Sequence, residues 1–216
     1  MATIDATQLR DSLRRLSASK TAIFGANSHS FLLNLPLTET DICTFEQRHS
    51  ISLPAEYRHF LSAIGNGGAG PYYGVFPLGM MDDSGDKLKP WRENDGFIGL
   101  LSKSFPLKDE WNDVRGMPSD ELLETDEQEY ERQLDEFEKG YWNSSLVNGA
   151  IPICHQGCAL RVWLVLNGEQ AGRLWRDGRS DQTGLSPMRL ANGSPARFSS
   201  WYSEWLDSAL KQARLI

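Results

Sequence analysis

Apolar residues recur at helical spacing in five parts of the chain, and the first and last of these are the simplest. In residues 6–16, three leucines at i, i+4 and i+7 alternate with arginines, which predicts a short amphipathic helix with a basic outer face. In residues 198–210, aromatic residues and leucines share a broad apolar face. This pattern predicts a closing helix whose aromatic side packs into the core.

A capping motif opens the second helical stretch. Thr38 and Asp41 have the spacing of a capping box, although aspartate is a weaker partner than glutamate in that motif. Ile42, Phe45 and His49 then lie on one helix face. We expect this helix to form a corner with the next one, which packs on the sheet.

The stretch 53–78 predicts a helix, a glycine turn and a strand, in that order. Pro54 has the fixed φ that suits a first helical position. Gly65 is expected to end the helix in the left-handed conformation, residues 66–68 to form a sharp turn, and residues 72–78 to form a strand. One apolar face recurs at i, i+3, i+4 and i+7 along the helix: Tyr57, Phe60, Leu61 and Ile64.

The glycines of this stretch also fit the G-x-G-x-x-G spacing of dinucleotide sites. Such a site needs a strand before the glycine loop and a helix after it, so that the pyrophosphate meets the positive end of the helix dipole. Here the predicted helix precedes Gly65 and the predicted strand follows Gly70. The order of the elements therefore argues against a nucleotide-binding loop.

Apolar runs predict the strands of the C-terminal half. Residues 151–154 and 160–166 are expected to be strands joined by a turn at 155–158. Asn167-Gly168 is a strong hairpin signal, and 172–176 is the expected partner strand. Weaker patterns predict three further segments: an edge strand at 29–35, a strand at 97–101 and a loop-rich segment at 181–195.

The most individual part of the chain is residues 102–141, which we interpret as an acidic helical insertion. Ten carboxylates lie on its polar faces, and only Arg132 and Lys139 relieve their repulsion. A purely structural helix has little reason to carry this one-sided charge, although many charge runs are simply solvated faces. A narrow apolar seam predicts one helix of about five turns: Leu123, Tyr130, Leu134, Phe137 and Tyr141.

The charge of the chain is concentrated around this segment. The formal net charge is −7, yet residues 81–140 hold 18 of the 29 acidic and 8 of the 22 basic residues, a local balance of −10. The rest of the chain carries +3. A nucleic-acid-binding protein shows the opposite sign in a clustered patch, so we expect no direct nucleic-acid binding.

Length and composition indicate one globular domain with an insertion, residues 1–216, or at most a domain and a half. No apolar run approaches the ~20 residues that a membrane span needs. The first residues lack the basic and apolar regions of a signal peptide. Three cysteines do not make a disulfide framework. We therefore expect reduced thiols in a cytoplasmic protein without a membrane segment.

Candidate chemistry is sparse. Cys154, His155 and Cys158 have zinc-like spacing, but the second ligand pair of a zinc site is missing, so we interpret them as turn and core residues and expect no metal or cofactor. The carboxylates at 82–86 lack the calcium-loop pattern and are expected in a solvated turn. The chain contains no G-x-S-x-G motif. We predict that it is not an enzyme; an unrecognised hydrolase remains an alternative because catalytic groups can converge without a local motif.

Together these motifs resemble a known family. A helix followed by Leu-Pro-x-x-Tyr-x-x-Phe-Leu and an Asn-Gly-Gly turn resembles the SMI1/KNR4 family, also called the SUKH superfamily. Residues 150–210 fit the same family in the right order, except that Ala159 stands where a second small residue, often glycine, is expected. The resemblance rests on seven residues of structural importance: Leu53, Pro54, Tyr57, Leu61, Asn66, Gly67 and Gly68.

The resemblance implies an α+β domain without a known catalytic centre. With the strand pattern, it predicts a single SMI1/KNR4-like domain in which a mainly antiparallel or mixed sheet packs against several helices, with residues 102–141 inserted. Bacterial members of the family are mostly immunity proteins that neutralise secreted toxins, and fungal members regulate cell-wall synthesis. An intracellular scaffold or regulator of wall or envelope synthesis is therefore the alternative function.

The acidic insertion suggests how a toxin would be bound. Many secreted toxins are nucleases with basic clefts, and an acidic helix can occupy such a cleft by charge mimicry. We therefore predict a protein partner, a basic toxin domain. Aromatic residues are the favoured hot spots of interfaces. The candidate contact residues combine both kinds: Trp111, Glu121, Glu124, Asp126, Glu127, Tyr130, Glu131, Asp135, Phe137 and Glu138.

Overall fold

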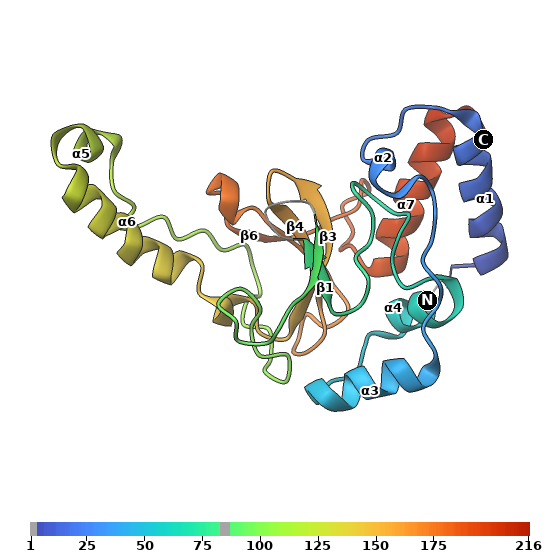
Figure 1. Cartoon of the computed structure of the whole chain (residues 1–216), viewed down its shortest axis with the longest axis horizontal. Helices are drawn as coiled ribbons and strands as arrows, with labels where there is room; N and C mark the ends of the chain where they lie inside the picture. The colour runs from blue at the N-terminus through green and yellow to red at the C-terminus, as the bar shows by residue number, and fades with distance from the viewer. Residues whose placement is uncertain (1–3, 83–86) are drawn as a thin grey trace.

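A four-stranded antiparallel sheet lies at the centre of the molecule (Figure 1). The computed structural model describes residues 4–82 and 87–216. It confirms the predicted α+β class, with seven α-helices in the described residues, and every strand pair in it is antiparallel. The sheet has the order β3-β4-β5-β6, with bounds Ala150–Gly157, Leu160–Val165, Leu174–Asp177 and Leu185–Pro187. A separate two-stranded ribbon contains β1 (Met80–Asp82) and β2 (Leu88–Pro90).

One group of helices lies against one side of the sheet, and two other helices project away from its opposite side (Figure 1). α1 packs on α7, and α4 packs on α7, so these three form the helical layer beside the sheet (Figure 1). Among the largest fully buried side chains, Tyr202 of α7 packs on Phe60, whereas Trp163 and Trp175 of the sheet pack on Phe97 and Phe105. The α-helices are α1 (Ala6–Ser19), α2 (Ala26–His29), α3 (Glu39–His49), α4 (Ala55–His59), α5 (Asp120–Thr125), α6 (Glu127–Tyr141) and α7 (Phe198–Gln212). Short 3-10 helices lie at Ser144–Val147 and Arg179–Asp181.

The first two predicted helices, which rest on apolar periodicity and a capping motif, are confirmed. α1 buries Leu9, Leu13 and Leu16 as its spacing predicts. At the start of α3, the Thr38 side chain accepts a hydrogen bond from the Asp41 N–H, and the Asp41 carboxylate accepts one from the Thr38 N–H. The capping box is therefore confirmed in both directions.

The helix that follows Leu53-Pro54 ends differently from the prediction. After α4 the chain continues as a π-helical turn, Phe60–Ile64, closed by a bond from the Gly65 N–H to the Phe60 carbonyl at 2.9 Å. Gly65 is extended (φ 177°), so the predicted left-handed conformation is wrong. A side chain would nevertheless clash there, since a Cβ on Gly65 would lie 2.8 Å from the Asn34 carbonyl oxygen.

The predicted strand at 72–78 is also wrong. Tyr72 and Gly74 have positive φ values of 54° and 98°, which break the extended run. Only Val75 forms bridges, to Gly68 on one side and to Cys154 on the other. The segment still lies along the edge of β3, where the Phe76 N–H donates to the Ile153 carbonyl at 2.8 Å.

Three other segments differ from their predictions. Residues 29–35 form no regular strand, because α2 occupies their start and only Leu33 makes a bridge. Residues 97–101 form a bend and an irregular segment, since the Asp95 carboxylate accepts from two backbone N–H groups there, although Ile98 and Leu101 are buried as expected. The loop at 181–195 contains the short strand β6.

The predicted hairpins of the C-terminal half are confirmed, with one shift. β3 continues through the residues predicted as a turn, and the reversal occurs at Cys158 and Ala159. Asp82, predicted in a solvated turn, is instead buried at the end of β1 and held by Arg161. The rest of that predicted turn, residues 83–86, lies outside the described residues. Within 4–82 and 87–216, no helix has the length and apolarity that a bilayer span requires.

Candidate partner-binding site

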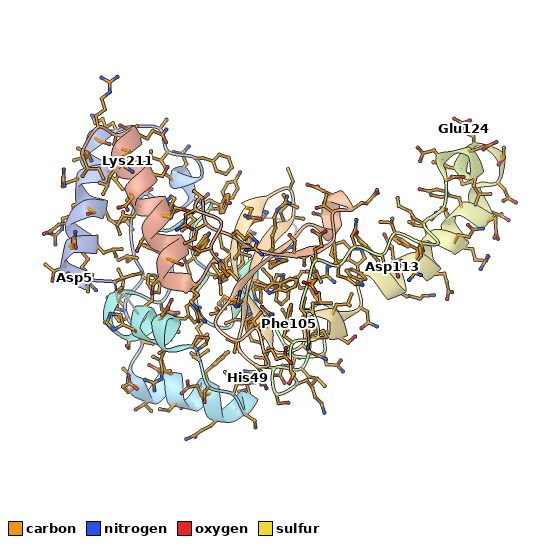
Figure 2. The ribbon with its side chains drawn as sticks, turned by 180° about the vertical axis from the view of Figure 1, so that it is seen from behind. Asp5, His49, Phe105, Asp113, Glu124 and Lys211 are labelled. Atoms are coloured by element: carbon orange, nitrogen blue, oxygen red, sulfur yellow. The ribbon has the colours of Figure 1, made fainter. Side chains whose placement is uncertain are left out.

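An acidic arm projects from the body of the molecule. The arm comprises residues 112–141: an extended segment, then α5, then α6, which returns toward the sheet (Figure 1). α6 has 15 residues and therefore spans about 22 Å. Figure 2 shows Glu124 at the far end of the arm and Lys211 at the opposite end of the molecule. The arm is thus well separated from the helical layer.

The predicted single helix is interrupted at Asp126, so that prediction is corrected. Asp126 has φ −152° and ψ 86°, outside the helical region. Its side chain accepts a hydrogen bond from the Glu129 N–H at 3.1 Å and caps α6. The residue favoured as a cap thus divides the acidic run into α5 and α6, which pack on each other at the tip.

An aromatic stack holds the arm to the body. Tyr141 is buried and stacks on Phe137, with ring centres 4.9 Å apart, and on Trp111, at 5.4 Å. The Tyr141 hydroxyl donates to the Asn112 side-chain oxygen at 2.7 Å. Trp111 itself pairs by two backbone hydrogen bonds with Leu185 in β6. The root of the arm is therefore joined to the sheet edge.

A buried ion pair lies directly behind this root. Arg179 donates two hydrogen bonds to the Asp177 carboxylate, the shorter at 2.7 Å, and both side chains are almost fully buried. The Arg179 guanidinium also lies over the Trp142 ring, 4.8 Å from its centre. Trp163 donates to the same carboxylate from within the sheet. These contacts fix the end of α6 on the sheet.

The arm carries the net negative charge of the chain. Residues 112–141 contain 11 acidic and 3 basic residues, a balance of −8, whereas the rest of the chain carries +1. Glu129 binds Arg132 at 2.7 Å, and the hydrogen bonds from Arg132 and Gln133 lower the pKa of Glu129 to about 2. At the root, the hydrogen bond from Arg115 lowers the pKa of Asp113 to about 2. In the described part of the chain, the other carboxylates of the arm form no ion pair.

The predicted contact residues fall into two groups. The carboxylates are exposed on α5, on α6 and at the break between them: Glu121, Glu124, Asp126, Glu127, Glu131, Asp135 and Glu138. Tyr130 is half-buried on α6, while Phe137 and Trp111 belong to the stack at the root. Sequence reasoning missed Asn112 and Arg179. Both bond to Tyr141, which lies 29 and 38 positions away from them, and no sequence motif marks contacts over such separations.

The family-motif residues have structural positions away from the arm. Leu53, Tyr57 and Leu61 are buried in the core. The turn is tight: Gly68 has φ 99°, and a Cβ there would lie 2.5 Å from the Leu32 carbonyl oxygen. The Asn66 side chain accepts a hydrogen bond from the Leu78 N–H at 2.8 Å, and Gly67 has φ 79°. Pro54 precedes the first residue of α4.

The cysteine and histidine residues at 154–158 are dispersed. Cys154 is buried, burial raises its thiol pKa, and its Sγ donates to the Pro71 carbonyl at 3.3 Å. Cys158 is exposed at the hairpin turn, and His155 faces Asp82. Across residues 4–82 and 87–216, no group of three or more histidine, cysteine, aspartate or glutamate side chains is placed to hold a metal ion.

Comparison with known proteins identifies the family. Searches of curated proteins and of solved structures returned no match. The family model described as SMI1 / KNR4 family (SUKH-1) matches residues 36–182, more than half of the chain and including the whole arm. This chain therefore belongs to the SMI1/KNR4 family (SUKH-1), whose domains are commonly immunity proteins of polymorphic toxin systems.

Proposed function

We propose that this chain is a non-catalytic immunity protein that neutralises a secreted toxin by binding it through the acidic arm. The observation that carries the proposal is the separation of charge: the arm holds −8 while the rest of the chain holds +1. Family membership supports the immunity role. A projecting surface with a strongly negative net charge favours a partner with a basic, concave face.

The chemistry of the arm suits a toxin that acts on nucleic acid. Such a toxin needs a basic cleft to hold phosphate groups. An arm with exposed carboxylates on successive turns can enter that cleft and replace the phosphates. Tyr130 offers an aromatic contact beyond the root, and Trp111 and Phe137 offer contacts next to it, in addition to their roles in the stack.

Growth rescue tests the immunity role. The toxic C-terminal domain of a secreted protein encoded beside this gene is expressed with and without this chain. We expect growth only when both are present. Growth arrest in the presence of well-expressed chain, for every such neighbouring domain, contradicts the immunity role and favours a regulator of envelope synthesis.

Association kinetics test the role of the arm, using that toxin domain. The arm variant carries Glu127→Gln, Glu131→Gln, Asp135→Asn and Glu138→Gln. The control variant changes the net charge equally on the body, with Asp11→Asn, Glu169→Gln, Asp181→Asn and Asp207→Asn. We expect the arm variant to associate about tenfold more slowly at low salt and to lose most of its salt dependence. Equally slowed association of both variants would show that net charge matters and the arm does not, and unchanged association of both would show that charge does not steer binding.

A further inference from the structure

A cleft on the body, away from the acidic arm, has apolar walls and a polar inner end. It has a volume of about 450 Å³ and opens between the 28–34 loop and the β1–β2 ribbon. Leu32 and Leu88 line its walls with 69% and 45% of their surface exposed, and Tyr73 beside them is 40% exposed. His155 and Asp82 lie at the inner end.

The orientation of His155 directs one of its ring nitrogens away from Asp82. Its Nδ1 lies 3.7 Å from the Asp82 carboxylate, which Arg161 holds by two hydrogen bonds of 3.0 and 3.1 Å. This contact directs Nδ1 toward Asp82 and leaves Nε2 on the opposite side of the ring. The Nε2 atom is buried and has no hydrogen-bond partner among the described residues. Tyr73 stacks on the ring at 5.3 Å and keeps its plane fixed.

The other polar groups of the cleft also favour a hydrogen-bond donor. Burial lowers the pKa of His29 to about 4, so its ring is uncharged at neutral pH and does not repel a cation. The Asn34 side chain donates to Asn66 and leaves its own oxygen as an acceptor. The described residues that line the cleft include no lysine or arginine. The lining therefore combines apolar walls, an aromatic ring and acceptors.

We propose that this cleft binds an arginine side chain of the protein partner. Its aliphatic stem lies between Leu32 and Leu88, and its guanidinium reaches the inner end beside Tyr73. There a side-chain movement that uncovers the buried atom lets the guanidinium donate to His155 Nε2, which has no hydrogen-bond partner among the described residues. Arginine suits this lining because its planar head stacks on aromatic rings and presents several donors, while its stem covers apolar surface. The inference rests on the proposed function in one respect, since it takes the partner to be a basic protein.

Small probes test the cleft without the toxin. The ¹⁵N-labelled full chain is titrated with Nα-acetyl-arginine methylamide, and with the corresponding lysine and glutamate compounds. We expect a saturable shift of the His155 Nε2 resonance with the arginine compound at millimolar concentration. A shift of equal affinity with lysine would overturn the assignment to a guanidinium, and preferential binding of glutamate or no saturable shift would overturn the cleft as a cation site.

Two variants locate the binding. Tyr73→Leu is expected to weaken binding of the arginine compound about threefold to fivefold, the size of an exposed cation–π contact. Phe24→Leu is the matched control, because Phe24 is exposed and packs on Tyr73 at 5.5 Å yet does not line the cleft. Equal affinities of these two variants would overturn the proposal. Failure here leaves toxin neutralisation by the arm intact, and failure of growth rescue leaves this titration interpretable.

Discussion

At the scale of single residues, the β3–β4 turn carries backbone strain that another residue would relieve. Cys158 and Ala159 both have positive φ values, 50° and 60°, which is the conformation of a type I′ turn. Such turns favour glycine at the second position, where a Cβ costs about 1–2 kcal/mol. We expect Ala159→Gly to raise the free energy of unfolding by about 0.5–1 kcal/mol, after the added flexibility of glycine is subtracted. Urea unfolding measures this.

The control for this substitution is Ala171→Gly. Ala171 is an exposed loop residue that is not among those with positive φ. There glycine only adds freedom to the unfolded chain, so we expect a loss of about 0.4–1 kcal/mol. A loss of stability in both variants would show that the hairpin turn is unstrained. The departure from the family pattern at position 159 would then have no energetic consequence.

His29 makes stability depend on acid. Burial lowers its pKa from 6.5 to about 4, so the folded state binds this proton less readily than the unfolded state. The stabilisation is complete above pH 6.5 and is lost as the pH falls toward 4. We expect the difference in unfolding free energy between pH 7 and pH 4.5 to be smaller in His29→Gln than in the unchanged chain. Parallel pH profiles of the two proteins would contradict this.

At the scale of elements, periodicity and local motifs correctly predicted those helices and hairpins whose conformation long-range contacts do not change. The leucine spacing of α1, the capping box of α3 and the Asn-Gly hairpin before β5 are local signals, and the structure has all three. Residues 72–78 are apolar enough for a strand, but Tyr72 and Gly74 turn the chain. Such turns depend on neighbours distant in sequence, which a pattern does not show.

The candidate site was predictable in its charge and not in its architecture. The carboxylates of α5 and α6 are visible in the sequence, so their concentration was expected. The break at Asp126 was missed because the acidic run continues through it, and only the capping bond to Glu129 marks a new helix. The cleft beside His155 was also missed, since its walls come from segments more than 50 residues apart.

The hydrogen bond between Tyr141 and Asn112 at the root of the arm leads to a separate prediction about α6. Tyr141→Phe removes the hydrogen bond to Asn112 and keeps the aromatic stack. A hydrogen bond of this kind contributes about 1 kcal/mol, so amide exchange in α6 is expected to rise about fivefold while the sheet stays protected. Tyr130→Phe is the control, because no hydrogen bond of the Tyr130 hydroxyl occurs within the described residues. Equal exchange in both variants would mean that this bond does not hold the arm.

At the scale of the whole molecule, the arm and the core are separable. No residue from 112 to 140 belongs to the buried core or packs against it, whereas Phe105 and Trp111 on one side and Val147 on the other do. The contact between Asn112 and Tyr141 brings the two ends of the arm together. A short connection can therefore replace the arm without straining the sheet.

We predict that the body folds without the arm. Residues 114–139 are replaced by Gly-Ser-Gly-Ser, which reaches at most about 14 Å and suffices for ends in side-chain contact. Because the core loses no side chain, we expect cooperative thermal unfolding with a midpoint within about 3 °C of the intact chain. The shortened chain should still bind the arginine compound and should fail to rescue growth. Loss of cooperative unfolding would show that residues 114–139 belong to the folding unit, and rescue by the shortened chain would place the toxin contact on the body.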